Sequence, residues 1–468
     1  MHSSLARDRE DLDDILAQAF RHAQAYLHGL DQRPAIAGLA EGDVGDTTAL
    51  PESGPGAAAA LDEFHREFEH HLSASPGSRY FGFVTGGATP ASLAADWLVG
   101  AYDQNAQLNN DTCAPHIEAQ AIDMLRQLLD WPAHWNGTCV TGATMANFTG
   151  LAIARQWCGR ELGHDIAAEG LHGLPPPTIF AGSAHSSTLK ALAMLGLGRN
   201  ALHALPLLPQ REALDVSALE SALEALNGAP AIVCASAGTV NTVDYDDLAA
   251  IARLKQRHRF WLHVDAAFGG IAAASNQHRH LLEGIEAADS VTVDAHKWLN
   301  VPYDCAVLFT AHLPLQLQVF QNHSPYLPPP RAVVNNYLHL GPENSRRWRA
   351  LPLWMTLRAY GRDGHAEIVE RNVDAARYFG EVIATEPRLR LAAPVRLNVV
   401  CFGLADNDDA KLAALKRRLD AEGTAYFSTS RLGDQAILRA AICNWRTTRA
   451  DIDRSFAALR DCLDAELQ

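Results

Sequence analysis

The sequence has little of what marks several large classes of protein. Its 468 residues contain no apolar run of membrane-spanning length and no apolar signal core near Met1, so we expect a chain without a membrane span. Basic residues number only 39 against 54 acidic ones, and the net charge of −15 argues against nucleic acid or an anionic membrane as a partner. Eight scattered cysteines form neither a CxxC pair nor a metal-binding spacing, which predicts reduced, mostly buried thiols, a cytoplasmic protein and no metal site.

What the sequence does have is length and apolar content: with 48% hydrophobic residues it can bury a large core. From residue 137 onward, strand-like runs alternate with helical stretches. This alternation predicts an α/β fold, with a mainly parallel central sheet, helices on both faces and a small-molecule ligand at the carboxyl ends of the strands. The expected strands are 178–180, 231–235, 260–264, 290–293 and 306–310, and the expected helices include 145–158, 217–226 and 246–258.

The two ends of the chain have different patterns. Apolar residues at helical spacing between 10 and 30 predict an amphipathic helix. Near the C-terminus, helical stretches and the strand-like runs 397–402 and 437–442 predict a small α+β domain. Arg439 lies on the second of these runs, where we expect a charge to be paired and structural.

One strand-like run ends in an unusual group of side chains, His296-Lys297-Trp298. A lysine beside apolar residues at the end of a buried strand is desolvated, which lowers its pKa and suits it to form a Schiff base with an aldehyde. From this stretch alone, a surface lysine whose stem covers Trp298 is an equally good interpretation.

A second apolar strand, further upstream, ends in Asp265-Ala266-Ala267 and two nearby glycines. Alone, Asp265 is a plausible turn residue. Near a Schiff-base lysine, however, an aspartate at a strand end is the partner that keeps a pyridinium nitrogen protonated. Together the two stretches resemble pyridoxal-phosphate enzymes of the aspartate-aminotransferase fold (fold type I), most closely the group II amino-acid decarboxylases, which include aromatic-amino-acid and glutamate decarboxylases.

This resemblance implies both the cofactor and the reaction. The cofactor is pyridoxal 5'-phosphate, held as a Schiff base on Lys297, and the reaction is decarboxylation of an L-amino acid to the amine and carbon dioxide. It also implies an N-terminal segment, 1–75, that packs across a homodimer with a shared active site, a large cofactor-binding domain, 76–360, and a small C-terminal domain, 361–468. Two alternatives remain: other pyridoxal-phosphate chemistry, such as an aldehyde synthase or a carbon–carbon lyase, and a non-catalytic regulatory homologue.

Further cofactor contacts are implied by motif matches. The turn after Gly142 opens a helix, which is either an anion site or an ordinary N-cap. In the family this turn holds the cofactor phosphate, which implies Ala143 and Thr144. The Ala-His-Ser-Ser element places His185 against the cofactor ring with a part in proton handling, although alone it could be a capping arrangement. The remaining implied contacts are Asp265, Thr239, Ala267, Asp294 and His296.

Aromatic residues that run into a glycine-rich turn resemble the segment lining the substrate pocket, which implies Phe83 and Val84; core packing is the alternative. The polar stretch 103–113 falls where aromatic-amino-acid decarboxylases carry further aromatic pocket residues. Its residues Asn109, Asn110 and Asp111 are able to hydrogen-bond a polar side chain. The substrate is therefore left open among aromatic, acidic and basic amino acids.

Residues 332–344 have little periodicity and are expected to form a loop that acts as a lid. The stretch resembles the mobile loop of the aromatic decarboxylases, whose tyrosine protonates the substrate carbon after carbon dioxide leaves. That role falls on Tyr337 here. Some relatives with phenylalanine at this position are aldehyde synthases, so the tyrosine favours simple decarboxylation.

Overall fold

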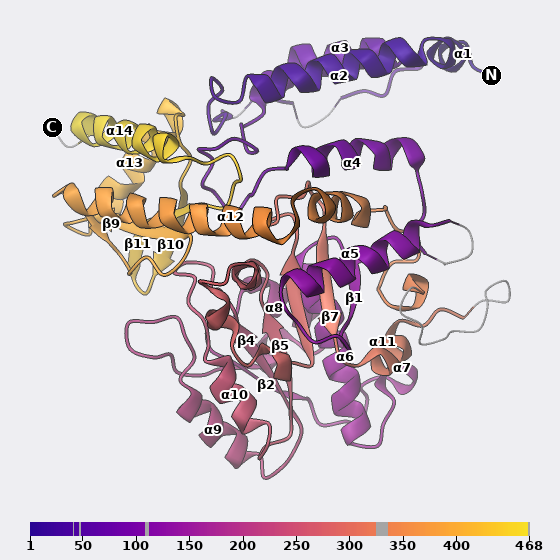
Figure 1. Ribbon diagram of the computed structural model, residues 1–468, viewed down its shortest axis with the longest axis vertical. Coiled ribbons are helices and arrows are strands. Elements are labelled where there is room, and N and C mark those ends of the chain that lie inside the picture. Colours follow the sequence, from indigo (N-terminus) through magenta and orange to yellow (C-terminus); the bar gives the residue numbers. More distant parts are fainter. Residues whose placement is uncertain (41, 46–47, 108–111, 324–335, 467–468) are drawn as a thin grey trace.

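The computed structural model describes residues 1–40, 42–45, 48–107, 112–323 and 336–466 (Figure 1). A seven-stranded sheet forms its centre, in the order β1-β7-β6-β5-β4-β2-β3. All neighbouring strands are parallel except β7, which runs antiparallel to both β1 and β6. The strands are β1 (Asn136–Val140), β2 (Thr178–Ala181), β3 (Leu202–Ala204), β4 (Ala231–Ser236), β5 (Phe260–Asp265), β6 (Ser290–Asp294) and β7 (Ala306–Thr310).

Helices cover both faces of this sheet, because its buried strands present apolar side chains in both directions. On β5, Leu262 and Val264 belong to one core cluster, whereas Trp261 belongs to another on the opposite face. The predicted mainly parallel α/β fold is confirmed. The helices of this part are α4 (Pro90–Tyr102), α5 (Ala114–Leu128), α6 (Ala143–Glu161), α7 (Ile166–Glu169), α8 (Ser186–Met194), α9 (Val216–Ala225), α10 (Leu248–Leu254) and α11 (Leu313–Phe320).

The C-terminal part has its own antiparallel sheet, in the order β10-β11-β9-β8, and its own apolar core. The long helix α12 (Ala350–Thr385) joins it to the central part, and Gly361 interrupts the helical backbone with φ 56° and ψ −163°. This kink falls at the predicted boundary between 360 and 361. The remaining elements are β8 (Leu389–Leu391), β9 (Val399–Leu404), α13 (Asp409–Glu422), β10 (Ser428–Leu432), β11 (Gln435–Ala441) and α14 (Arg449–Glu466).

The N-terminal helices form a layer at the edge of the molecule. In Figure 1, α1 (Ser3–Glu10), α2 (Leu12–His28) and α3 (Ala57–Glu67) lie above α4, on the outside of the fold. None of these three helices has a buried residue, although they carry the apolar side chains of the predicted amphipathic stretch. The exposed large apolar or aromatic side chains on α1–α4 are Leu5, Leu12, Leu16, Phe20, Phe64, Trp97, Leu98 and Tyr102.

No helix within the described ranges is both long enough and apolar enough to cross a bilayer. Seven of the eight cysteines are buried, Cys113 is exposed, and all eight are free thiols. The expectation of mostly buried cysteines is confirmed.

Candidate active site

Lys297 follows β6, and its amine points to the last residue of that strand. Lys297 Nζ lies 2.8 Å from Asp294 Oδ2, and Asp294 Oδ1 lies 3.5 Å from His296 Nε2. Trp298 is buried and donates its indole hydrogen to Asn372, so the lysine stem does not serve to cover a surface tryptophan. Lys297 is therefore a partly exposed amine at the carboxyl end of the sheet.

The sequence predicted a lowered pKa for Lys297, and this is wrong for the free amine. Burial does lower the pKa, but the carboxylate of Asp294, with a smaller contribution from Asp265, outweighs it and raises the net pKa. The sequence could not anticipate this, because the Asp294 side chain turns back toward the amine only in the folded loop.

The start of α6 provides an anion site beside this pair. Gly142 caps the helix without a side-chain bond, and a Cβ there would lie 3.3 Å from His296 Cε1 and 4.0 Å from Asp294 Oδ1. The amides of Met145 and Ala146 bond to the Gly142 carbonyl. The amide hydrogens of Ala143 and Thr144, at the positive end of a 19-residue helix, therefore face outward for an anion.

Asp265 ends β5 and is held from two sides. Its Oδ2 accepts a hydrogen bond of 2.9 Å from Asn147 Nδ2, and its Oδ1 accepts one of 3.2 Å from the Ala267 amide. The Ala267 carbonyl in turn accepts a hydrogen bond of 2.7 Å from the Asp294 amide. The Ala267 backbone thus links the Asp265 carboxylate to the backbone of Asp294.

His185 precedes α8 and accepts through Nδ1 from both the Ser187 hydroxyl, at 2.7 Å, and the Ser187 amide, at 3.2 Å. Nδ1 therefore carries no proton, and the neutral ring is protonated at Nε2. Partial burial lowers the pKa of His185 despite the nearby charge of Asp265, which keeps the ring neutral. His185 therefore caps α8, as the capping alternative predicted, and it also lies in the site.

These residues fit pyridoxal phosphate. Free helix amides suit its phosphate, the Asp265 carboxylate suits a protonated ring nitrogen, the His185 imidazole suits the ring face, and the Lys297 amine suits the aldehyde.

Thr239 does not join this group. Its hydroxyl donates to Glu212 Oε2 at 2.7 Å and accepts from the Asp244 amide at 2.9 Å, and its side chain is buried. These bonds hold the hydroxyl in the loop after β4, which it stabilises, and the cofactor contact of Thr239 stays a prediction.

Phe83 and Val84 were predicted together as pocket residues, but the fold separates them. Val84 is buried in the core, so core packing is correct for it, whereas Phe83 is 66% exposed. The turn that carries them lies against the lysine loop, since a Cβ on Gly86 would lie 1.9 Å from the Lys297 carbonyl oxygen. Phe83 alone remains a candidate for substrate contact.

Tyr337 is not a mobile-loop residue. It begins a short 3-10 helix, Tyr337–His339, has 0% of its surface exposed, and its ring lies 5.2 Å from the Arg346 guanidinium. Arg346 is itself paired with Glu118 in the interior. This buried position does not support the predicted role as proton donor, which stays a prediction. Residues 332–335 of the predicted lid, and likewise Asn109, Asn110 and Asp111, lie outside the described residues.

Arg439 was expected to be paired, and the structure shows the opposite. It is 3% exposed, and its Nε and Nη2 have no hydrogen-bond partner among the residues described. Its charge helps to lower the pKa of His185, and the pKa of Cys443 responds to both Arg439 and Lys297. An unpaired buried cation beside the site is a candidate functional residue. In the sequence, the only indication of this was that Arg439 is the one charged residue of an apolar strand.

Tyr303 was also missed by the sequence reasoning. Its ring centroid lies 4.4 Å from that of His296, and its hydroxyl lies 3.3 Å from Thr85 Oγ1. Three further partly or fully exposed aromatic side chains contact one another, and together with Tyr303 we call them the aromatic rim: Tyr80, Phe83 and Tyr426.

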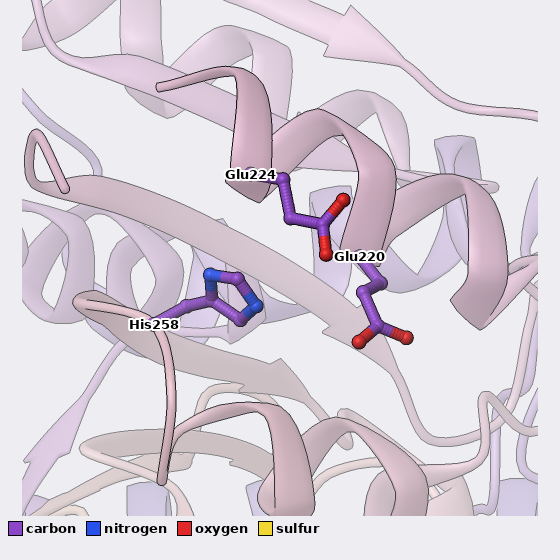
Figure 2. A group of neighbouring side chains, drawn as sticks. All are labelled: Glu220, Glu224 and His258. Atoms are coloured by element: carbon purple, nitrogen blue, oxygen red, sulfur yellow. The ribbon is translucent and has the colours of Figure 1, made fainter. Parts of the chain in front are cut away.

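One group of described side chains elsewhere has the composition of a metal site. Glu220 and Glu224 of α9 and His258 place ligand atoms within 4.8 Å of one another (Figure 2). Glu220 already pairs with Arg257 at 2.6 Å, and Glu224 is exposed. A neighbouring cation and solvent therefore satisfy these charges, and we assign no metal to the group.

Comparisons with known proteins agree with this geometry. Residues 47–405 match the family model described as the pyridoxal-dependent decarboxylase conserved domain. The chain is 31% identical over 470 residues to L-2,4-diaminobutyrate decarboxylase of Rhizobium meliloti, covering 96% of this chain and 92% of that protein. It is 29% identical over 469 residues to aromatic-L-amino-acid decarboxylase of Sus scrofa, covering 94% of each.

Solved structures share the fold. Oryza sativa TDC, crystallised with pyridoxal phosphate and tryptamine, superposes with a TM-score of 0.90 at 23% identity, over 98% of this chain and 99% of that one. Rhodiola rosea 4-hydroxyphenylacetaldehyde synthase superposes with a TM-score of 0.84 at 20% identity, over 99% of each chain. With a family model across most of its length and a relative 31% identical over nearly all of it, the chain belongs to the group II pyridoxal-phosphate-dependent amino-acid decarboxylases.

Proposed function

We propose that this decarboxylase converts an L-amino acid to the corresponding amine and carbon dioxide, with Lys297 as the covalent attachment point of pyridoxal phosphate. The supporting observation is the convergence of Lys297, Asp265, His185 and the start of α6 at the carboxyl ends of the strands. When bound, the cofactor supplies an electron sink for the electron pair left on Cα.

Each of the other side chains around the cofactor has a separate role in this proposal. Asp265 holds a proton on the cofactor ring nitrogen, and the amides of Ala143 and Thr144 bind the phosphate, with His296 beside them. The carboxylate of Asp294 keeps the free Lys297 amine protonated until that amine is used. His185, neutral and protonated at Nε2, supports the ring face and can donate that proton.

Arg439 supplies the charge that a carboxylate substrate needs. Its buried guanidinium has donors without partners, so an anion beside it gains hydrogen bonds and neutralises its charge. We assign it to the substrate carboxylate.

The aromatic rim supports an aromatic amino acid as the substrate. Tyr303 packs against His296, the neighbour of Lys297, and the exposed rings of the rim offer apolar faces on which a substrate ring can stack. The second candidate is a basic amino acid. It is supported by the relative named as a diaminobutyrate decarboxylase and by the polar residues of the stretch 103–113.

We also infer a homodimer and a cytoplasmic location. Helices α1–α3 form an outer layer above α4 (Figure 1), and these helices carry exposed apolar side chains, which a second copy of the chain would remove from water. A reducing compartment suits eight free thiols. Analytical ultracentrifugation checks the dimer, since Phe20→Asp and Leu16→Asp should shift the protein toward monomer; a wild-type monomer at micromolar concentration would contradict it.

The test of the reaction is carbon dioxide release from a panel of aromatic, acidic and basic L-amino acids, with products identified by mass. We expect one class to give its amine with the wild type and no product with Lys297→Ala. Lys411→Ala, an exposed lysine on α13, serves as the matched control and should retain wild-type turnover. An aldehyde with hydrogen peroxide and ammonia in place of the amine would support the aldehyde-synthase alternative instead.

A further inference from the structure

The carboxamide of Asn147 lies at the centre of a buried hydrogen-bond network beneath the site. Asn147 is in the second turn of α6 and has 0% of its surface exposed. Its amide nitrogen donates to Asp265 Oδ2 at 2.9 Å and to the Ser187 hydroxyl at 3.0 Å. Ser187 in turn lies 2.7 Å from His185 Nδ1. One side chain thus contacts Asp265 directly and His185 through one hydroxyl.

The other end of the carboxamide is fixed as firmly. Asn147 Oδ1 accepts from the Thr292 hydroxyl at 2.7 Å and lies 3.0 Å from His263 Nε2. His263 Nδ1 lies 2.8 Å from the Ser290 hydroxyl, which accepts from the Trp261 indole at 2.9 Å. The Ser290 hydrogen therefore goes to Nδ1, and the His263 proton lies on Nε2. All four hydrogen-bonding positions of the Asn147 amide are then used, in one orientation only.

The network has a direction. Each step from Trp261 through Ser290, His263 and Asn147 donates toward Asp265, and every one of these donors is neutral. Burial lowers the pKa of His263 to about 4, so this ring adds no positive charge beneath the carboxylate. A neutral donor fixes the Asp265 carboxylate in place. It leaves the negative charge of that carboxylate to pair with the protonated ring nitrogen of the cofactor.

We propose that Asn147 is a positioning residue: through one locked carboxamide it holds the Asp265 carboxylate aimed at the cofactor ring, and it holds Ser187 under His185. This inference rests on the proposed function, in which Asp265 and His185 bind the ring. It adds that Asn147 positions both Asp265 and His185, so a substitution of Asn147 should weaken the contacts of both residues with the cofactor ring.

Asn147→Asp tests the donor function with the smallest change of shape. Aspartate keeps the acceptor for Thr292 and His263 but, when ionised, cannot donate to Asp265. Two buried carboxyl groups at this distance share a proton, so at low pH the new carboxyl donates to Asp265 and the bond is restored. Pyridoxal phosphate is titrated into each apoprotein, and the dissociation constant is followed by absorbance between pH 6 and 8.5.

At the alkaline end we expect Asn147→Asp to bind pyridoxal phosphate at least about tenfold more weakly than the wild type, with the gap closing as the pH falls. Among the described residues, the other titratable or charged groups that interact with Asp265 are His185, Cys234, His263 and Lys297, and Asp294 and Arg439 act on His185. They are present in both proteins, so the ratio to the wild type at each pH isolates the substituted residue. Asn398→Asp, an equally buried asparagine in the C-terminal part, is the matched control and should leave the ratio constant.

Wild-type affinity of Asn147→Asp at every pH, or a gap that does not change with pH, would overturn the inference. Asp265→Asn separates this from failure of the proposed function: if Asp265→Asn also binds the cofactor normally, the role of Asp265 is wrong. Should Asn147→Asp fail to fold, Thr292→Val decides, because it removes one of the two donors that lock the amide. We expect about a threefold loss of cofactor affinity for Thr292→Val, and no loss would overturn the inference.

Discussion

Lys297 Nζ and Asp294 Oδ2 form an ion pair of 2.8 Å at the carboxyl end of the central sheet. Asp294 is almost fully buried, and its other oxygen has no hydrogen-bond partner among the described residues. The carboxylate faces both Lys297 and His296, and it raises the pKa of the lysine against the opposing effect of burial. A lysine must lose its proton before it attacks an aldehyde, so we expect Asp294 to influence the pH at which the cofactor is attached.

Asp294→Asn removes this carboxylate, and we expect the pKa of Lys297 to fall. The rate of cofactor attachment to the apoprotein, followed by the visible absorbance, should then reach half of its maximum at a lower pH than in the wild type. Asp304→Asn is the control, since Asp304 pairs with Arg349 and not with Lys297. An unchanged midpoint for Asp294→Asn would remove Asp294 from control of the lysine.

Arg439→Met should separate binding from stability. Loss of a charge-assisted contact is expected to raise KM for the amino acid by roughly tenfold or more, whereas the thermal midpoint should hold or rise, because an unpaired buried charge is removed. Arg390→Met on β8 of the same sheet, whose guanidinium bonds to Asn407 and Gln435, is the control for KM. A normal KM together with a lower midpoint would indicate that Arg439 is structural after all.

Tyr337→Phe should retain the amine product at close to the wild-type rate. The Tyr337 hydroxyl is buried with no partner in the described part of the chain, and burial raises its pKa well above the usual value. Removing this hydroxyl therefore costs no hydrogen bond. Tyr337→Ala, which leaves a cavity beside Arg346, should lower the free energy of unfolding by about 3–5 kcal/mol. Replacement of the amine by an aldehyde in Tyr337→Phe would return this tyrosine to the chemistry.

His263 should make the protein sensitive to acid. Its pKa is about 4 in the folded chain against an ordinary value of 6.5, so the unfolded chain takes up the proton first as the pH falls. The free energy of unfolding is therefore unaffected by protonation of His263 above pH 6.5. It falls as the pH drops from 6.5 to about 4, by an amount on the order of a few kcal/mol. Thermal midpoints of His263→Gln should fall less between pH 7 and 5 than those of the wild type. The exposed His172→Gln should follow the wild type, and a parallel fall in His263→Gln would contradict the prediction.

Local sequence patterns were enough to predict the layers of the fold and the chemistry at the strand ends. The alternation of apolar runs and helical stretches reports which segments are buried, and each run from β2 to β7 except the short edge strand β3 was predicted within a residue or so. β3 is partly exposed and too short to show a pattern. The antiparallel direction of β7 also escaped prediction, because direction depends on how a chain returns and not on its composition.

The sequence by itself determined that Lys297, Asp265 and His185 end three strands or the turns after them, because parallel strands bring their carboxyl ends to one edge. Only the tertiary structure decided which partners these groups have. Asn147 reaches Asp265 across 118 residues, Arg439 approaches His185 from the C-terminal sheet, and Tyr337 and Thr239 turn away from the site. The physical reason is that periodicity describes the face on which a side chain lies, whereas hydrogen bonds and ion pairs depend on neighbours that are distant in the chain.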